Sequence, residues 1–77
     1  MTDPELITAA VEASGLSARR FAVRVLSRDE RTIRRWQAGE IAIPPTARAW
    51  LERWVSLSDG TRQRILGALD REPTQPP

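Results

Sequence analysis

Several residue types that build common functional sites are absent from this 77-residue chain. It has no cysteine and no histidine, which excludes disulfide bonds and the usual ligand sets of structural zinc sites. It also lacks a glycine-rich phosphate loop and paired acids that would flank an evident cleft. We therefore expect a protein that is not an enzyme and that holds neither a cofactor nor a metal ion.

Long apolar runs are also missing. Residues 1–15 carry acids, and no stretch of the chain approaches the roughly 20 apolar residues that span a bilayer. We expect a cytoplasmic protein without a signal peptide or a membrane segment. A chain of this length suits one small domain, which buries only about 60% of the surface that its unfolded chain exposes.

Charge is distributed unevenly along the chain. Residues 17–36 contain seven arginines but only Asp29 and Glu30 as acids, a net charge of +5, whereas the remaining residues carry −3. A basic centre between acidic ends is typical of a surface that binds a polyanion. All twelve basic residues are arginines, so the alternative is a solvated surface in an arginine-rich protein.

Helix signals recur along the chain, and no alternation typical of strands is present. Asp3 and Pro4 are expected to cap and start the first helix, and Gly15 to end it. Ser17 is expected to cap the second helix. The pattern predicts a compact, all-α domain over residues 1–70, with helices over 3–14, 17–26, 29–39, 45–57 and about 58–70, and a disordered tail over 71–77.

The third predicted helix has two distinct faces. Ile33 and Trp36 lie three residues apart, so both can face a core while charged residues occupy the remaining surface. At about 1.5 Å per residue the segment is roughly 15 Å long, which suits a DNA major groove about 12 Å wide. Its start allows two caps, either Asp29 alone or a capping box formed by Ser27 and Glu30.

A resemblance to a known family covers residues 16–44, which read L-S-A-R-R-F-A-V-R-V-L-S-R-D-E-R-T-I-R-R-W-Q-A-G-E-I-A-I-P. This run resembles the phage repressor and Cro-like (XRE-type) helix-turn-helix family in its L-S, F-A, T-I and R-W pairs and in the later glycine and proline. The resemblance extends over about residues 5–57. Two departures fall in the turn, which has one extra residue near Ser27–Arg28 and has Ser27 where glycine is usual.

The resemblance implies a five-helix, lambda-repressor-like domain in which the second and third helices form the helix-turn-helix. The third helix would enter the major groove, and the second would brace against the phosphate backbone. Arg31 and Arg35 lie one turn apart, and each guanidinium can grip guanine O6 and N7. The residues implied for base contacts are Glu30, Arg31, Thr32 and Arg35, and those for phosphate contacts are Ser17, Arg19, Arg28 and Arg34.

The function that follows is sequence-specific binding of double-stranded DNA by a transcription regulator. One helix reads only about four or five base pairs, so we expect a homodimer on an inverted-repeat operator. A small repressor or autoregulator of a phage or mobile element fits this reading. Control then comes from its own concentration or from a partner protein.

The fourth and fifth predicted helices carry more apolar residues than one core-facing stripe needs. We expect Trp50, Trp54, Ile65, Leu66 and Leu69 to lie in the core or in a dimer contact, with the fifth helix as a candidate for dimerisation. The exposed arginines Arg48 and Arg53 are expected to be solvated. The alternative function is a helical protein-binding module that uses the Trp50/Trp54 face, with the arginines incidental.

Overall fold

The computed structural model describes residues 1–71, and all regular structure in that range is helical. The helices are α1 (Asp3–Ser14), α2 (Ala18–Arg20), η1 (Phe21–Val25), α3 (Glu30–Ala38), α4 (Pro45–Ser56) and α5 (Asp59–Arg71). The π-helical turn η1 directly continues α2, so the two form one helical segment. The predicted all-α fold with five helices is thus confirmed for residues 1–71. The predicted tail lies outside the described residues except for Arg71, which ends α5.

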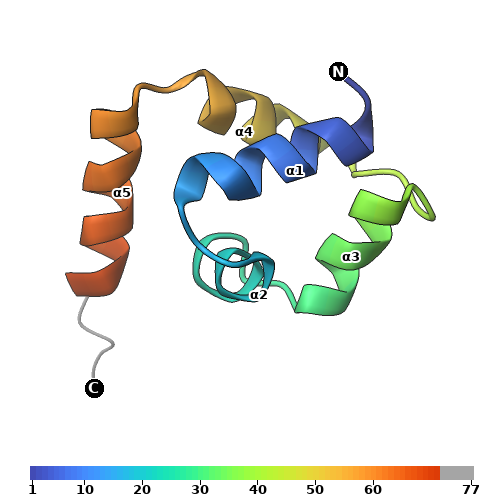
Figure 1. The fold of residues 1–77 in the computed structure, drawn as a ribbon, viewed down its shortest axis with the longest axis horizontal. Coiled ribbons are helices and arrows are strands. Elements are labelled where there is room, and N and C mark those ends of the chain that lie inside the picture. Colours follow the sequence, from blue (N-terminus) through green and yellow to red (C-terminus); the bar gives the residue numbers. More distant parts are fainter. Residues whose placement is uncertain (72–77) are drawn as a thin grey trace.

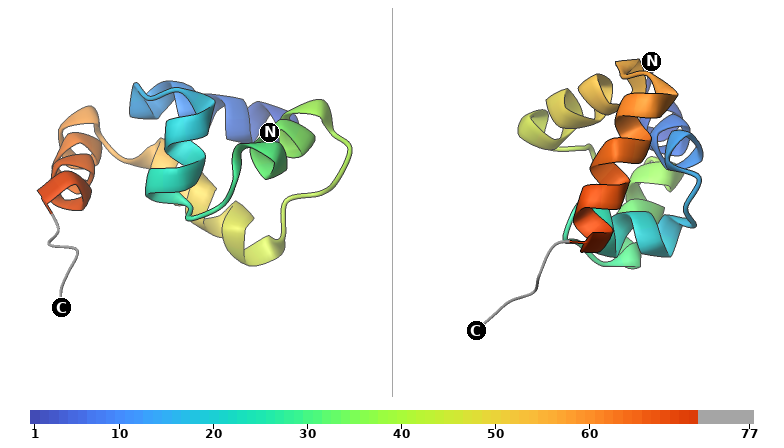
Figure 2. Two further views of the ribbon diagram at one scale, coloured as in Figure 1. Left: turned by 90° about the horizontal axis from the view of Figure 1, so that it is seen from below. Right: turned by 90° about the vertical axis from the view of Figure 1, so that its left-hand side faces the viewer.

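The helices are arranged around α1, which lies against both α3 and α4 (Figure 1). The segment of α2 and η1 packs against α3. Helix α5 stands at one end of the molecule, where it contacts α1 and η1 (Figures 1 and 2). Helix α3 therefore lies at the end opposite α5 and is supported by α1, α2 and η1.

The core is formed where α1, η1, α3 and α4 meet. Trp54 lies at its centre with 1% of its surface exposed, and its indole N–H donates a hydrogen bond to the carbonyl of Ala10 at 3.1 Å. The Trp54 and Phe21 rings lie 6.0 Å apart in a tilted arrangement. The buried apolar residues are Leu6, Ile7, Ala10, Phe21, Ala22, Ile33, Trp36, Ile43, Leu51 and Trp54.

The start of α1 differs from the prediction. Thr2, rather than Asp3, is the N-cap: its hydroxyl accepts from the Glu5 N–H, and the Glu5 carboxylate accepts from the Thr2 N–H at 2.9 Å. Asp3 is thereby left to accept from the backbone N–H of Ile43 at 2.9 Å and from the Arg48 guanidinium. The expectation that Arg48 is solvated is wrong, because this side chain joins α4 to the start of α1.

A second arginine, Arg62, joins α4 to α5. Its side chain is buried, and it donates to the carbonyls of Trp54 and Leu57 and to the Asp59 carboxylate. A cation at this position is favourable because the last carbonyls of a helix carry partial negative charge. Arg62 therefore fixes the direction in which α5 leaves α4, a role that the apolar pattern of the sequence does not indicate.

The five residues expected in the core or in a dimer contact lie in different surroundings. Trp54 is in the core, whereas Trp50 stacks on Trp54 at 5.4 Å with 41% of its surface exposed. Ile65 is exposed, and Leu66 and Leu69 are half-buried. Of the residues of α5, Leu66 packs against the core. Of these five residues, Trp50 and Ile65 are therefore the two that expose apolar surface to solvent.

The difference between the two stacked tryptophans gives a first prediction. Trp54→Ala should lower the free energy of unfolding by about 3–5 kcal/mol, because it empties a packed core site. Trp50→Ala should lower it by only about 0.5–1.5 kcal/mol, since it removes one partner of an aromatic pair at the surface. Urea denaturation of both variants followed by circular dichroism measures this, and equal losses would contradict the burial of Trp54.

Candidate nucleic-acid interface

Helix α3 turns an apolar edge inward and a basic face outward. Ile33 and Trp36 are almost completely buried, while Arg31, Arg34 and Arg35 are exposed. This follows from the helical period, because residues three apart share a face and those between them point elsewhere. The core contacts of Ile33 and Trp36 thus decide that the arginines face solvent.

The start of α3 settles the choice between the two predicted caps. Asp29 is the N-cap, and its carboxylate accepts from both the backbone N–H and the hydroxyl of Thr32 at 3.1 Å. These hydrogen bonds from Thr32 lower the pKa of Asp29, and the positive charges of Arg31 and Arg35 lower it further. The capping box is not formed, so α3 begins at Glu30.

The turn between η1 and α3 combines a wider helical turn with a residue at positive φ. The N–H of Leu26 donates to the carbonyl of Phe21 at 3.3 Å, which is the wider π-helical spacing and takes up an additional residue. The N–H of Arg28 reaches the carbonyl of Ala22 at 2.9 Å. Ser27 has a φ of +54°, the left-handed conformation that glycine adopts most easily. The connection to α3 is thus made by a π-turn followed by a left-handed residue, Ser27.

Arg28, expected to contact phosphate, covers the outer surface of the core. Its guanidinium carbon lies 5.4 Å from the centre of the Trp36 ring, within the range of a cation–π contact. Arg28 itself remains exposed. This contact attaches the turn to α3.

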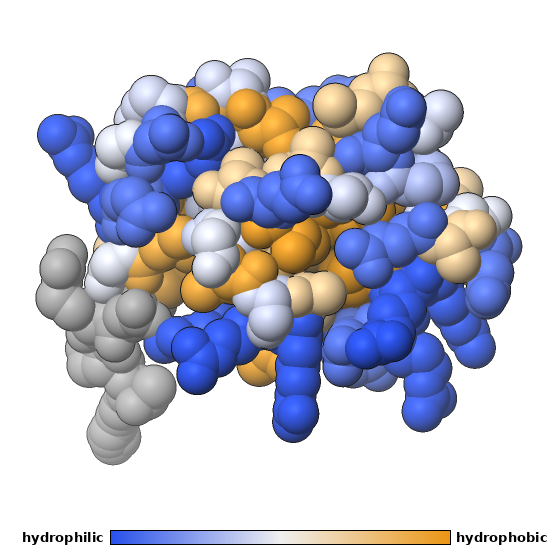
Figure 3. Space-filling view, in the orientation of Figure 1, coloured by the Kyte–Doolittle hydropathy of each residue, from blue (hydrophilic) through white to orange (hydrophobic). Residues whose placement is uncertain are grey.

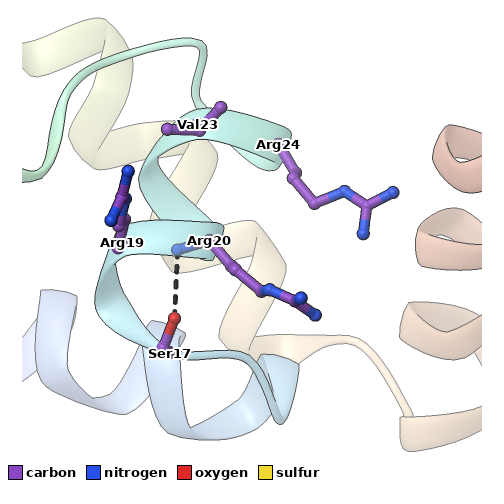
Figure 4. Close-up of a pocket in the computed structure, with 5 residues that line it drawn as sticks. All are labelled: Ser17, Arg19, Arg20, Val23 and Arg24. Carbon is purple, nitrogen blue, oxygen red and sulfur yellow. Dashed lines mark hydrogen bonds between the residues drawn. The ribbon is translucent and has the colours of Figure 1, made fainter.

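The outer surface of α2 and η1 is hollowed and basic. An open hollow of about 360 Å³ is lined by five residues (Figure 4). Two of them, Ser17 and Arg19, belong to the predicted phosphate-contacting set. The Ser17 hydroxyl accepts from the Arg20 N–H at 3.2 Å and so caps α2. In Figure 4 the side chains of Arg20 and Arg24 extend toward α5, and that of Arg19 extends to the other side of the helix. The lining residues are Ser17, Arg19, Arg20, Val23 and Arg24.

Val23 was not among the predicted site residues. More than half of its surface is exposed, which is unusual for a valine that directly follows two buried residues, Phe21 and Ala22, in a helical segment. Its spacing of four residues from Arg19 and three from Arg20 places it on their face of a helix. That spacing is visible in the sequence and could have indicated its exposure.

The polar side chains of α3 differ in whether they already have partners. Glu30 accepts from the Nε and Nη2 atoms of Arg34 at 3.0 and 2.7 Å, and Thr32 is bound to Asp29. The side chains of Arg31 and Arg35 make no hydrogen bond or ion pair with the other described residues of 1–71. Strongly hydrophilic side chains project over α2 and α3 along one edge of the face in Figure 3. The predicted base-contacting set is thus divided into two bound and two open side chains.

Comparison of the chain with protein-family models, curated proteins and solved structures gives no match. Within residues 1–71, no helix is both long enough and apolar enough to cross a membrane. The same residues contain no group of three or more acidic side chains arranged to hold a metal ion. The basic surface of α2 and α3 is therefore the feature from which a function can be argued.

The left-handed turn gives a second prediction. Ser27→Gly should raise the free energy of unfolding by about 0.5–1 kcal/mol, because glycine relieves the strain of a side chain at positive φ, partly offset by its greater freedom when unfolded. Ser17→Gly is the matched control, since Ser17 has an extended backbone and loses only its cap. Chemical denaturation of the three proteins measures both effects. A loss of stability in Ser27→Gly would contradict the strained turn.

The cap of α3 gives a third prediction, which concerns pH. Because the pKa of Asp29 is lowered in the folded protein, its stabilising effect is complete above its ordinary value of 3.8 and is lost as the pH falls through the lowered value. Asp29→Asn keeps an acceptor oxygen but cannot titrate. Urea denaturation between neutral pH and pH 2.5 should show a shallower acid loss for this variant. Parallel curves for the two proteins would remove Asp29 from the acid response.

Proposed function

We propose that this protein is a sequence-specific DNA-binding transcription regulator that places α3 in the major groove. The observation that carries the proposal is the orientation of α3, whose buried Ile33 and Trp36 leave Arg31 and Arg35 exposed, with side chains that make no hydrogen bond or ion pair within the described part of the chain. Nine residues at about 1.5 Å each give a helix of about 14 Å, a length suited to the groove.

The segment before α3 supports the proposal. Helix α2 with η1, the turn at Ser27 and α3 follow one another as the two helices and connection of a helix-turn-helix do. Arg19 is exposed on the outer surface of α2, and Arg34 is exposed on α3. In the proposed complex they contact phosphates, together with Ser17 and Arg28, and fix the register without reading bases. Phosphate contacts from α2, from the turn and from α3 then lie on either side of the base-reading face of α3.

The regulator acts as a homodimer on an inverted-repeat operator. One α3 reads about four or five base pairs, which occur too often in a genome to mark one site, and a two-fold pair doubles that information. Half-sites then lie about one turn, or 34 Å, apart. The resemblance of residues 16–44 to the phage repressor and Cro-like family supports a repressor or autoregulator of a phage or mobile element, working in the cytoplasm.

A second candidate function is a protein-binding module. The observation that favours it is Trp50, a large apolar side chain with 41% of its surface exposed beside the Trp54 ring. Association through this face would depend weakly on salt. DNA binding through several arginines would weaken steeply as salt rises, because bound counterions are released from DNA.

Operator binding gives a fourth prediction. Purified protein should protect an inverted repeat upstream of its own gene in footprinting with competitor DNA present. Arg35→Ala should weaken operator binding about 5- to 150-fold, the value of one bidentate contact to a base, without lowering the thermal midpoint. Arg53→Ala is the matched control, because Arg53 is also an exposed arginine and lies on α4.

A salt series separates the two candidate functions in the same experiment. The proposed function requires that the logarithm of the affinity falls steeply and linearly with the logarithm of salt concentration. Binding that competitor DNA removes completely, or no binding at any salt, would overturn it. Equal losses in Arg35→Ala and Arg53→Ala would show that α3 does not carry the specificity.

A further inference from the structure

We infer that each half-site contains two G·C pairs no more than two base-pair steps apart, with the guanines read by Arg31 and Arg35, and that Glu30 and Thr32 read no base. This inference rests on the proposed function. It narrows four sequence-predicted base readers to two and names the bases that they recognise.

First, Glu30, one of the four residues predicted to contact bases, is already paired with Arg34. Both hydrogen bonds from Arg34 end on one carboxylate oxygen of Glu30, through Nε at 3.0 Å and Nη2 at 2.7 Å. Glu30 has 32% of its side chain exposed, less than half the value for Arg34. The pair neutralises this carboxylate and leaves only its other oxygen, Oε1, to accept a hydrogen bond from cytosine N4. It is therefore poorly placed to discriminate between bases.

The second step concerns Thr32. Its hydroxyl donates to the Asp29 carboxylate at 3.1 Å, and the same oxygen accepts from its backbone N–H. These bonds hold the hydroxyl over the first turn of α3 and occupy its only proton. Thr32 thus completes the cap and has no proton left to donate to a base.

The third step is the geometry of the two remaining side chains. Arg31 and Arg35 are four residues apart, so their positions differ by about 6 Å along the helix axis. Arg31 lies in the first turn of α3 and Arg35 in its last turn, and the charges of both lower the pKa of Asp29. A base pair occupies about 3.4 Å of DNA length, so 6 Å corresponds to fewer than two steps.

The fourth step is the match of chemistry. A guanidinium presents only donors, arranged as a fork. In the major groove guanine presents two neighbouring acceptors, O6 and N7, whereas adenine presents an acceptor beside a donor. The guanidinium groups of Arg31 and Arg35 lie on one face of the helix. They therefore select two guanines, whichever strand carries each.

The pairing of Glu30 with Arg34 has a separate consequence. Glu30→Gln removes the negative charge that neutralises Arg34, so that Arg34 meets its phosphate with its full charge. Affinity should then rise for all DNA sequences alike, with about one more unit in the salt slope. If Glu30 instead reads cytosine, the same variant should lose the preference at one base pair.

The experiment is selection of bound sequences from a random pool of double-stranded DNA, followed by sequencing. The proteins are the unchanged chain, Arg31→Ala, Arg35→Ala, Glu30→Gln and the control Arg53→Ala, each checked for folding by circular dichroism. We expect two preferred G·C pairs within two steps. Arg31→Ala should flatten the preference at one of them and Arg35→Ala at the other, while Glu30→Gln and Arg53→Ala should retain both.

The outcomes distinguish the inference from the proposed function. Failure to enrich any sequence would overturn both. An enriched motif without the paired guanines would overturn the inference alone, as would a motif in which Glu30→Gln abolishes a base preference. A motif that loses both guanines with either arginine variant would show that the two side chains do not read separate bases.

Discussion

The burial of Trp54 is the constraint on which the rest of the structure depends. Its ring fills the space between α1, α4 and η1, and its indole N–H reaches the carbonyl of Ala10. The Trp54 carbonyl in turn accepts from Arg62 of α5. One residue therefore connects four helical segments, and the bond to Ala10 satisfies a polar group that would otherwise be costly to bury. In a domain this small, few other side chains are large enough to do so.

The outward face of α3 is a consequence of what its inward face contacts. Once Ile33 and Trp36 are held against the core, the helical period leaves Arg31 and Arg35 no direction except toward solvent. Asp29 and Gly39 cap the two ends of the helix. Arg28, which precedes the helix, lies over the Trp36 ring. A basic face is thus produced by apolar contacts, and the DNA binding proposed for it depends on the same contacts.

Internal pairing decides which charged residues remain open to a partner. The excess of arginine in residues 17–36 indicates a basic surface, yet Arg34 is already bound to Glu30 and Arg28 to an aromatic ring. Elsewhere Arg48 and Arg62 hold helices together. A count of arginines therefore overstates the number of groups that a ligand can meet. Arg31 and Arg35 differ from these bound side chains because they are exposed and make no hydrogen bond within the described residues. They are therefore better candidates for contact with a ligand than net charge alone would indicate.

The sequence by itself determined the helices, most of their ends, the inward residues of α3 and the basic character of its outer face. These features are local, because capping, helix period and glycine conformation depend on residues a few positions apart. The Glu30–Arg34 pair is also local, but several such pairs of similar small energy compete along an arginine-rich helix. The caps of α1 at Thr2 and of α3 at Asp29 are made by such local contacts too, whereas the tertiary structure turned residues 21–25 into a π-turn. It alone placed Asp3 beside Ile43 and Arg48, and Trp50 at the surface. Those outcomes depend on which segments far apart in the chain are brought into contact, and no local pattern contains that information.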